Sequence, residues 1–182
     1  MKPTYTYSPA LQARMVVLLN RYFTPFALVM VGMGLALSQP KGYVGPLCVG
    51  LLIFTGLFNF ATAKMARMTG EATKRMSTVR MGVNLSVNVL LVYLLGGYWT
   101  SIWLLFVLTP VATAVYSTRE RTAAVSAGVS GLLLGTHAIR GLNAPVDWGQ
   151  AVVHALFIVF LSMFIHELVE MVRGAEHRTP AG

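Results

Sequence analysis

Six apolar stretches occupy most of this chain, and each is long enough, or nearly long enough, to cross a lipid bilayer as a helix. A spanning helix needs ~20 mostly apolar residues, because the hydrocarbon layer offers the backbone no hydrogen-bond partner. The sequence therefore predicts an all-α fold, an integral membrane bundle of six transmembrane helices that forms a single domain over residues 1–182. The predicted spans are residues 15–37, 43–63, 81–95, 99–116, 122–139 and 148–169.

The composition excludes an ordinary soluble domain. Hydrophobic residues make up 55% of the chain and charged residues only 11%, whereas a soluble domain carries ~25% charged residues. The formal net charge of +8 is spread between the apolar stretches rather than gathered into one patch. This distribution is typical of topology signals and of contacts with anionic lipid, and it argues against a nucleic-acid partner. Cys48 lies inside an apolar stretch and is predicted to be a small buried side chain.

The positively charged residues predict the orientation of the bundle. Only Lys41 and Arg140 fall on one side of the membrane, and the other 12 of the 14 Lys and Arg residues fall on the opposite side. Cytoplasmic loops carry the excess of Lys and Arg, so both chain ends are predicted to be cytoplasmic and to face an anionic inner leaflet. The cytoplasmic residues are Lys2, Arg14, Arg21, Lys64, Arg67, Lys74, Arg75, Arg80, Arg119, Arg121, Arg173 and Arg178.

The longest predicted cytoplasmic connection covers about residues 64–80. Apolar side chains recur there at helical spacing beside Lys74 and Arg75, namely Met65, Met68, Ala72, Met76 and Val79. The pattern predicts a short amphipathic helix on the inner leaflet. A protein-docking face is the alternative, because Met-rich surfaces adapt to different partners.

Small residues recur every four positions along the fifth predicted span, at Ala123, Ala127, Gly131 and Gly135. Small side chains on one helix face let two helix backbones approach closely inside a membrane. We expect this face to pack against neighbouring helices of the same bundle. Self-association of the chain through this face is the alternative.

Asn84 and Asn88 lie four residues apart in the third predicted span and therefore share a helix face. An amide that faces lipid is costly, so both side chains are expected to face the bundle interior. There they either form interhelical hydrogen bonds or line one wall of a ligand site.

His137 and His154 are both predicted near the outer ends of their spans, at a shared depth. If the two helices touch, the histidines form either a pair of haem ligands or a hydrogen-bonded, proton-responsive pair. The same region carries Arg140 and Asp147. These two residues are expected to form a salt bridge that closes the outer loop, and an anion-binding arginine is the alternative.

The sequence predicts no enzyme and no metal site. The segment from His166 to Glu170 is similar to a zinc-protease motif, but Glu170 replaces the second histidine. We expect this segment to be a helix end that emerges into water, with a metal site as the alternative. No nucleophile–base set, phosphate-binding glycine loop or pair of intramembrane carboxylates accompanies it. The acids outside the chain termini, Glu71, Glu120 and Asp147, all fall in predicted loops, which argues against an ion-coupled transporter.

The middle of the chain resembles a known family. Residues 84–97 end in Gly96 and Gly97, an aromatic and polar turn follows over residues 98–105, and the next apolar stretch carries a central Pro110. This arrangement, over residues 80–140, resembles the six-helix membrane sensor region of bacterial histidine kinases of the type IV pilus and redox-sensing types. In the redox-sensing members the turn reads Gly-Gly-x-x-Asn-Pro-Phe and is implicated in quinone binding. Here the two glycines match, whereas Thr100, Ser101 and Ile102 replace Asn-Pro-Phe.

The resemblance implies a place in the bacterial cytoplasmic membrane and a ligand site formed by the outer turn and the face of the third span. The implied ligand-binding residues are Asn84, Asn88, Gly96, Gly97, Tyr98, Trp99, Thr100 and Ser101. After Val172 only residues 173–182 remain, so we expect no kinase domain and signalling through a partner. The resemblance thus implies a non-enzymatic, sensor-like or regulatory module that binds a ligand or partner within the bilayer.

Two other functions agree with the sequence. The first is an accessory subunit of a larger membrane complex, or a homo-oligomer, because the predicted tails are short and the inner connection is Met-rich. The second is a substrate-capturing subunit of a vitamin importer, which has about the same length and number of spans. Quinone and haem are the candidate cofactors.

Overall fold

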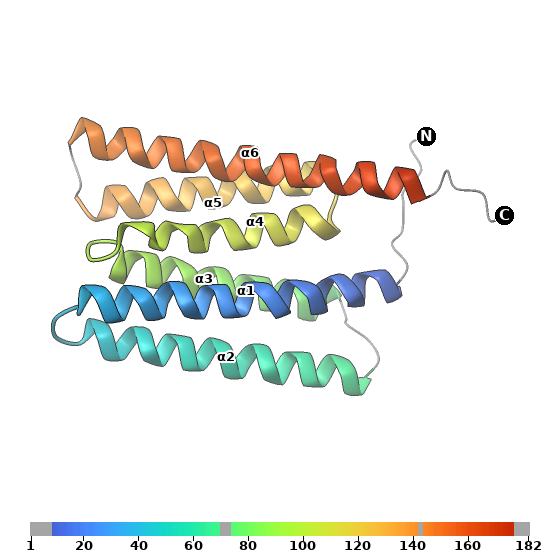
Figure 1. The fold of residues 1–182 in the computed structure, drawn as a ribbon, viewed down its shortest axis with the longest axis horizontal. Coiled ribbons are helices and arrows are strands. Elements are labelled where there is room, and N and C mark those ends of the chain that lie inside the picture. Colours follow the sequence, from blue (N-terminus) through green and yellow to red (C-terminus); the bar gives the residue numbers. More distant parts are fainter. Residues whose placement is uncertain (1–8, 70–73, 142–143, 177–182) are drawn as a thin grey trace.

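The structure is a computed structural model that describes residues 9–69, 74–141 and 144–176. These residues form six α-helices and one short 3-10 helix, and they contain no β-strand. The predicted all-α fold is therefore confirmed for the described chain (Figure 1). The elements are α1 (Pro9–Ser38), α2 (Val44–Thr69), α3 (Lys74–Leu95), η1 (Thr100–Leu104), α4 (Leu105–Tyr116), α5 (Arg119–Ile139) and α6 (Pro145–Glu176).

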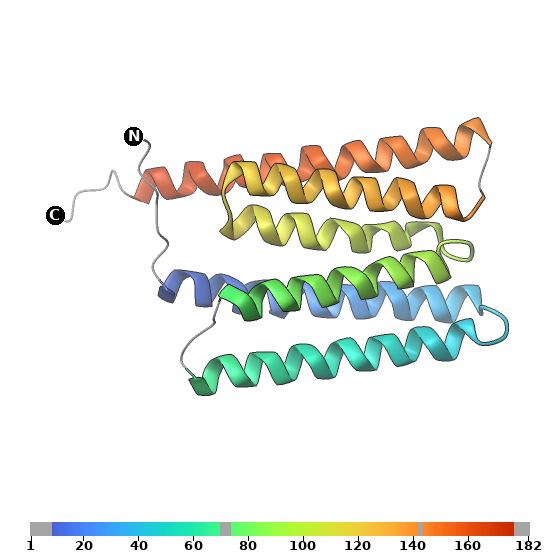
Figure 2. The ribbon, with the colours of Figure 1, turned by 180° about the vertical axis from the view of Figure 1, so that it is seen from behind.

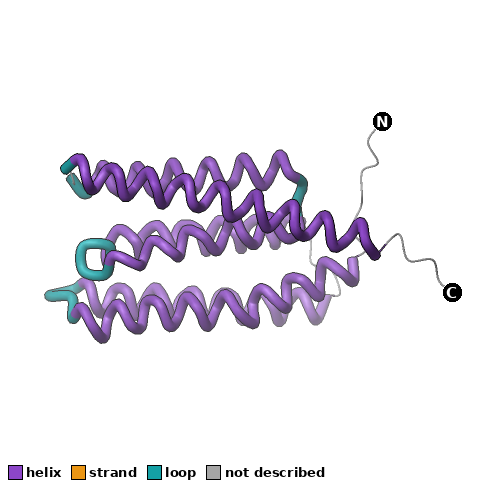
Figure 3. The backbone as a smooth tube through the Cα atoms, turned by 45° about the horizontal axis from the view of Figure 1, so that its top comes forward, coloured by secondary structure: helices purple, strands orange, loops and turns teal. Residues whose placement is uncertain are grey.

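The helices run up and down in one bundle with short connections at the two ends (Figure 3). We call the end at which α3 finishes and α6 begins the Arg140 end, and the opposite end, at which α4 finishes and α5 begins, the Arg119 end. The start of α1 and the finish of α6 both lie at the Arg119 end (Figure 1). In two opposite views α3 and α4 lie in the middle of the bundle, with α2 at one edge and α6 at the other (Figures 1 and 2).

Five helices of the described chain contain a segment long and apolar enough to cross a membrane. The chain is thus a candidate multi-pass membrane protein. In the structure the fourth predicted span consists of the 3-10 helix η1 followed by α4, and its apolar part, Thr100–Val115, is shorter than the apolar segments of the other five helices. The five longer segments are Arg21–Ser38, Val44–Thr62, Thr78–Leu95, Arg119–Ile139 and Pro145–Val172.

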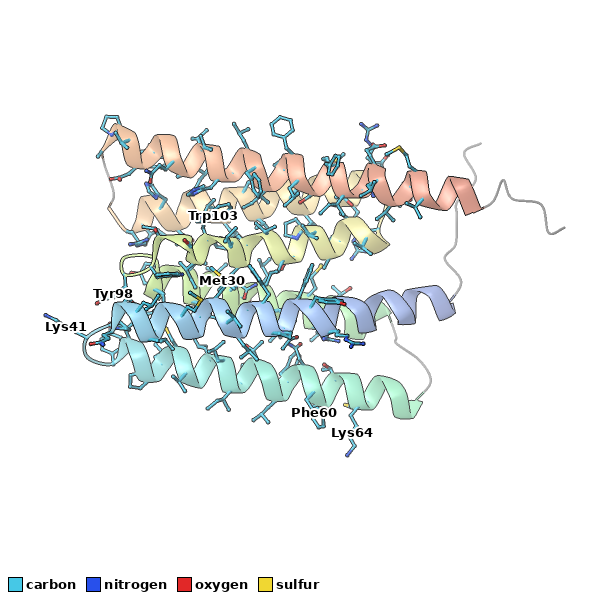
Figure 4. All side chains as sticks on the ribbon, in the orientation of Figure 1. Met30, Lys41, Phe60, Lys64, Tyr98 and Trp103 are labelled. Carbon is cyan, nitrogen blue, oxygen red and sulfur yellow. The ribbon has the colours of Figure 1, made fainter. Side chains whose placement is uncertain are left out.

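The tightest packing joins α4, α5 and α6, and α4 also contacts α1 and α3. Phe106 of α4 is fully buried at the centre, against apolar side chains of the other helices. In contrast, α2 packs mainly on α3 and turns large apolar side chains outward, among them Phe60 (Figure 4). Cys48 of α2 is fully buried, which agrees with its prediction as a small core side chain.

The predicted amphipathic helix over residues 64–80 is not a separate element. Its first part continues α2 as far as Thr69, and its last part begins α3 at Lys74. No glycine or proline interrupts α2 between Gly56 and Gly70, so the helix has no residue that would end it at the expected membrane boundary. Residues 70–73 lie outside the described chain.

The small-residue ladder of α5 does not pack inside the bundle, so this prediction is wrong. Ala127, Gly131 and Gly135 are exposed, and a Cβ atom placed on either glycine would meet no atom within 4 Å. The buried face of α5 is instead lined by Thr122, Ser126, Val129, Ser130, Leu133 and Thr136. Small hydroxyl side chains permit the same close approach of helices as glycine, and the Ser130 hydroxyl donates a 2.9 Å hydrogen bond to the Ala155 carbonyl of α6.

Candidate functional site

Gly96 and Gly97 form the turn that ends α3 at the Arg140 end. The Gly96 N–H donates to the Val92 carbonyl at 2.9 Å, and the Tyr98 and Trp99 N–H groups both donate to the Leu95 carbonyl at 2.8 Å. These bonds close the last turn of the helix and reverse the chain within four residues. The chain then enters η1 at Thr100.

The Arg140 side chain lies directly against these two glycines. A Cβ atom on Gly96 would lie 2.5 Å from one terminal guanidinium nitrogen of Arg140 and 2.5 Å from the Val92 carbonyl oxygen. A Cβ atom on Gly97 would lie 2.9 Å from the other terminal nitrogen. Both distances are far shorter than a carbon–nitrogen contact. The guanidinium therefore occupies space that exists only because both residues lack side chains.

Arg140 caps the carboxyl end of α5 and is half-buried. Partial burial lowers the pKa of its guanidinium, and the neighbouring Tyr93 phenol acts in the opposite direction. An arginine nonetheless stays charged at any physiological pH. The carboxyl end of α3, which carries the negative end of a helix dipole, stabilises that charge.

The predicted salt bridge between Arg140 and Asp147 does not form in the described part of the chain. Asp147 lies in the first turn of α6. Within the described residues, the Arg140 guanidinium donates no side-chain hydrogen bond to any other group. The structure thus places at this end of the bundle a charged fork whose donors have no partner among the described residues.

The two histidines lie in contacting helices at the Arg140 end, each against a tryptophan. The His154 ring stacks on Trp103, with centroids 4.0 Å apart and planes 12° apart, and the His137 ring meets Trp148 edge-on at 5.2 Å. In Figure 4, Trp103 lies between α4 and the α5–α6 hairpin. These contacts account for the positions of both rings without a ligand.

Trp99 faces the other side of the turn. Its ring packs on Gly34 of α1, where a glycine Cβ atom would lie 3.4 Å from the indole. The Trp99 Nε1 and His137 Nε2 atoms are both buried and have no hydrogen-bond partner among the described residues. Tyr98 and Thr100 are exposed, and Ser101 is half-buried. The turn residues predicted as a site therefore surround the end of α3.

Asn84 and Asn88 lie apart from this turn and engage other helices. The Asn84 side chain exchanges two 3.1 Å hydrogen bonds with the Asn59 amide of α2, and the Asn88 amide donates to the Leu105 carbonyl at 3.1 Å. Both face the protein interior, as expected. Asn84 lies about 18 Å along the helix axis from Gly96, because each helical residue rises ~1.5 Å. The structure therefore does not bring Asn84 and the glycine turn together.

His166, the first residue of the segment predicted to emerge into water, is buried, so this prediction is wrong for the histidine. His166 is buried, and its Nδ1 atom lies 3.2 Å from the Ala114 carbonyl in the last turn of α4. Glu167 is exposed and forms a 3.4 Å ion pair with Arg119. In the described ranges no group of three His, Cys, Asp or Glu side chains is arranged to hold a metal ion.

Sequence reasoning missed two partners. Asn59 is a lone amide between two phenylalanines in the second apolar stretch, and the cost of an unpaired amide in lipid already indicated that it needs a partner. The contact of Arg140 with the glycine turn had no such signal, because residues 97 and 140 are far apart in the chain.

No family model, curated protein or solved structure matches the chain. The resemblance to the sensor region of histidine kinases rests on its residues alone.

Proposed function

We propose that the chain crosses the bacterial cytoplasmic (inner) membrane six times, with both ends in the cytoplasm. Together, η1 and α4 supply the sixth pass. A 3-10 helix rises ~2.0 Å per residue and an α-helix ~1.5 Å, so the two elements cover roughly 28 Å of a hydrocarbon layer ~30 Å thick. An even number of passes agrees with α1 starting and α6 finishing at the same end (Figure 1). The position of 12 of the 14 Lys and Arg residues supports the cytoplasmic assignment.

Within this membrane the chain acts as a non-enzymatic, sensor-like or regulatory module that binds a ligand or partner at the Arg140 end. One observation carries this proposal: Gly96 and Gly97 leave space for the Arg140 guanidinium, whose donors have no partner among the described residues. A half-buried charge that serves only the fold is normally paired or fully hydrogen-bonded. Quinone remains a candidate ligand because of the double glycine, and haem because of His137 and His154.

Purification from native membranes tests this function. The protein is extracted in mild detergent, and mass spectrometry identifies every small molecule and chain that accompanies it. A stoichiometric small molecule is expected with the wild-type protein and is expected to be lost from Gly97→Leu, because the new side chain displaces the guanidinium. Gly50→Leu is the matched control, since a side chain at Gly50 meets open space on α2. If Gly97→Leu retains the small molecule, the ligand site does not lie at the turn formed by Gly96 and Gly97.

The alternative function, an accessory subunit of a membrane complex or a homo-oligomer, has its own supporting observation. The exposed face of α5 presents Gly128, Gly131 and Gly135 to open space, and such a face suits close helix docking in lipid. Gly131→Leu would then detach the partner chain while the isolated protein stays folded. Ser130→Leu, on the buried face, would instead unfold the protein, and Gly50→Leu would change neither property.

A further inference from the structure

Arg140 is a cation that membrane topology does not explain. The Lys and Arg residues predicted as cytoplasmic are those that orient the helices. Of the two on the opposite side, Lys41 is exposed and extends away from the bundle (Figure 4), as a loop lysine is expected to do. Arg140 instead folds back against the protein, where partial burial disfavours its charge. A compensating group must favour this position.

The protein supplies only part of that compensation. The dipole of α3 favours a cation at its carboxyl end, but the Val92 and Leu95 carbonyls at that end already accept backbone N–H groups. Asp147 forms no ion pair with Arg140 in the described chain. The planar fork of the guanidinium is therefore held in place with donors to spare.

A second donor group lies one helical turn away. His137 precedes Arg140 by three residues on α5, which places both on one face of the helix. The His137 Nε2 atom is buried and has no partner in the described residues. When that nitrogen carries the ring proton, it is a donor like the guanidinium. In that tautomer, a ligand that meets both groups must offer acceptors only.

We propose that Arg140 binds a phosphate oxyanion at this end of the bundle, either the headgroup phosphate of an anionic phospholipid or free inorganic phosphate. This inference rests on the proposed function and names the ligand chemistry of its site. A guanidinium matches two phosphate oxygens with parallel charge-assisted hydrogen bonds. The depth also fits, because Tyr98 and Trp148 mark the belt at which aromatic residues meet headgroups.

The test measures binding to the purified full-length chain in neutral detergent. Its probes are mixed micelles that contain phosphatidylglycerol, the same micelles with phosphatidylcholine, and inorganic phosphate alone. Arg140→Gln removes the fork, and Lys41→Gln is the matched control that removes the other cation on this side. We expect one anionic probe to bind the wild-type protein and Lys41→Gln equally, and Arg140→Gln about 10-fold more weakly or worse.

Binding of the phosphatidylglycerol micelles identifies a lipid headgroup site, whereas binding of inorganic phosphate identifies a site for a soluble anion. Equal binding by wild type and Arg140→Gln, an equal loss in Lys41→Gln, or no binding of either probe overturns the inference. If Arg140→Gln fails to fold, Arg140→Lys is measured instead. Lysine keeps the positive charge but cannot form two parallel hydrogen bonds, so weaker binding supports the inference and unchanged binding overturns it.

The failure of the phosphate inference and the failure of the proposed function can be told apart. A native ligand retained by Arg140→Gln but lost from Gly97→Leu contradicts only the phosphate inference, whereas phosphate binding without any native ligand or partner contradicts only the sensor-like function.

Discussion

The side-chain amides of Asn59 and Asn84 donate to each other's oxygen across α2 and α3, at 3.1 Å in each direction. Arg80 Nε adds a 3.0 Å hydrogen bond to the Asn59 oxygen. Because α2 has few buried side chains of its own, this polar pair is a principal specific contact between α2 and the rest of the bundle. The pair therefore uses Asn84 to hold the fold together.

Replacing Asn84 with alanine is expected to lower the free energy of unfolding by about 1–2 kcal/mol, because both bonds of the pair are lost and interhelical hydrogen bonds in membranes are individually weak. Reversible unfolding in mixed detergent micelles measures this change. Ser86→Ala is the control, since Ser86 is exposed on the same helix. Equal stability of the two variants would show that the amide pair does not hold α2.

A double-mutant cycle between Gly97 and Arg140 is expected to show measurable coupling. The alanine Cβ in Gly97→Ala would lie 2.9 Å from the guanidinium, so the side chain of Arg140 must move and lose its place on the turn. In the Arg140→Ala background the same substitution has nothing to displace. We expect a coupling energy of about 0.5–1 kcal/mol from the melting of the four proteins, because the flexible end of Arg140 can shift at modest cost.

Gly96→Ala provides the contrast within the same turn. Its Cβ would lie 2.5 Å from the Val92 carbonyl as well as from Arg140, and a helix carbonyl cannot move aside as a flexible side chain can. Arg140→Ala is therefore expected to rescue Gly97→Ala but not Gly96→Ala. Rescue of both variants, or of neither, would contradict the packing of Arg140 on the turn.

His166→Ala is expected to destabilise the protein by about 1–3 kcal/mol, because it leaves the buried Ala114 carbonyl without its partner. The neighbouring Glu167→Gln breaks only an exposed ion pair with Arg119, which is worth at most about 1 kcal/mol. Thermal melts in detergent separate the two outcomes. A larger loss for Glu167→Gln would show that His166 is solvated rather than buried between α4 and α6.

The ends of two helices could be predicted from the sequence. The predicted spans end at residues 95 and 139, and α3 and α5 end at Leu95 and Ile139. In the first case the signal was Gly96 and Gly97, because adjacent glycines favour a turn over a helix. The start of η1 was not predictable in this way, because it depends on the extended backbone of Trp99 after the turn. The tight 3-10 turn then shortens the apolar helix that follows.

The buried face of a helix could not be predicted from the sequence where two faces both carry small side chains. On α5 both the glycine ladder and the row of Ser and Thr residues permit close approach, and the sequence of α5 does not distinguish them. The choice depends on α6, which places the Ala155 carbonyl opposite Ser130. The contact of Arg140 with Gly97 has the same origin, since it requires the ends of α3 and α5 to meet in space.

The number of membrane passes is settled by the side on which chosen residues react. Lys41 is exposed at the Arg140 end and Arg119 at the opposite end. In a Cys48→Ser background, Lys41→Cys is expected to react in intact cells with a membrane-impermeant thiol reagent, whereas Arg119→Cys is expected to react only after permeabilisation. A single cysteine appended at the carboxyl terminus separates six passes from five, because only an even number returns the chain to the cytoplasm. If the appended cysteine reacts in intact cells, the chain crosses the membrane five times, and η1 and α4 do not span it. With five passes, the distribution of Lys and Arg between the Arg140 end and the Arg119 end would no longer match the rule that cytoplasmic loops carry the excess of cations.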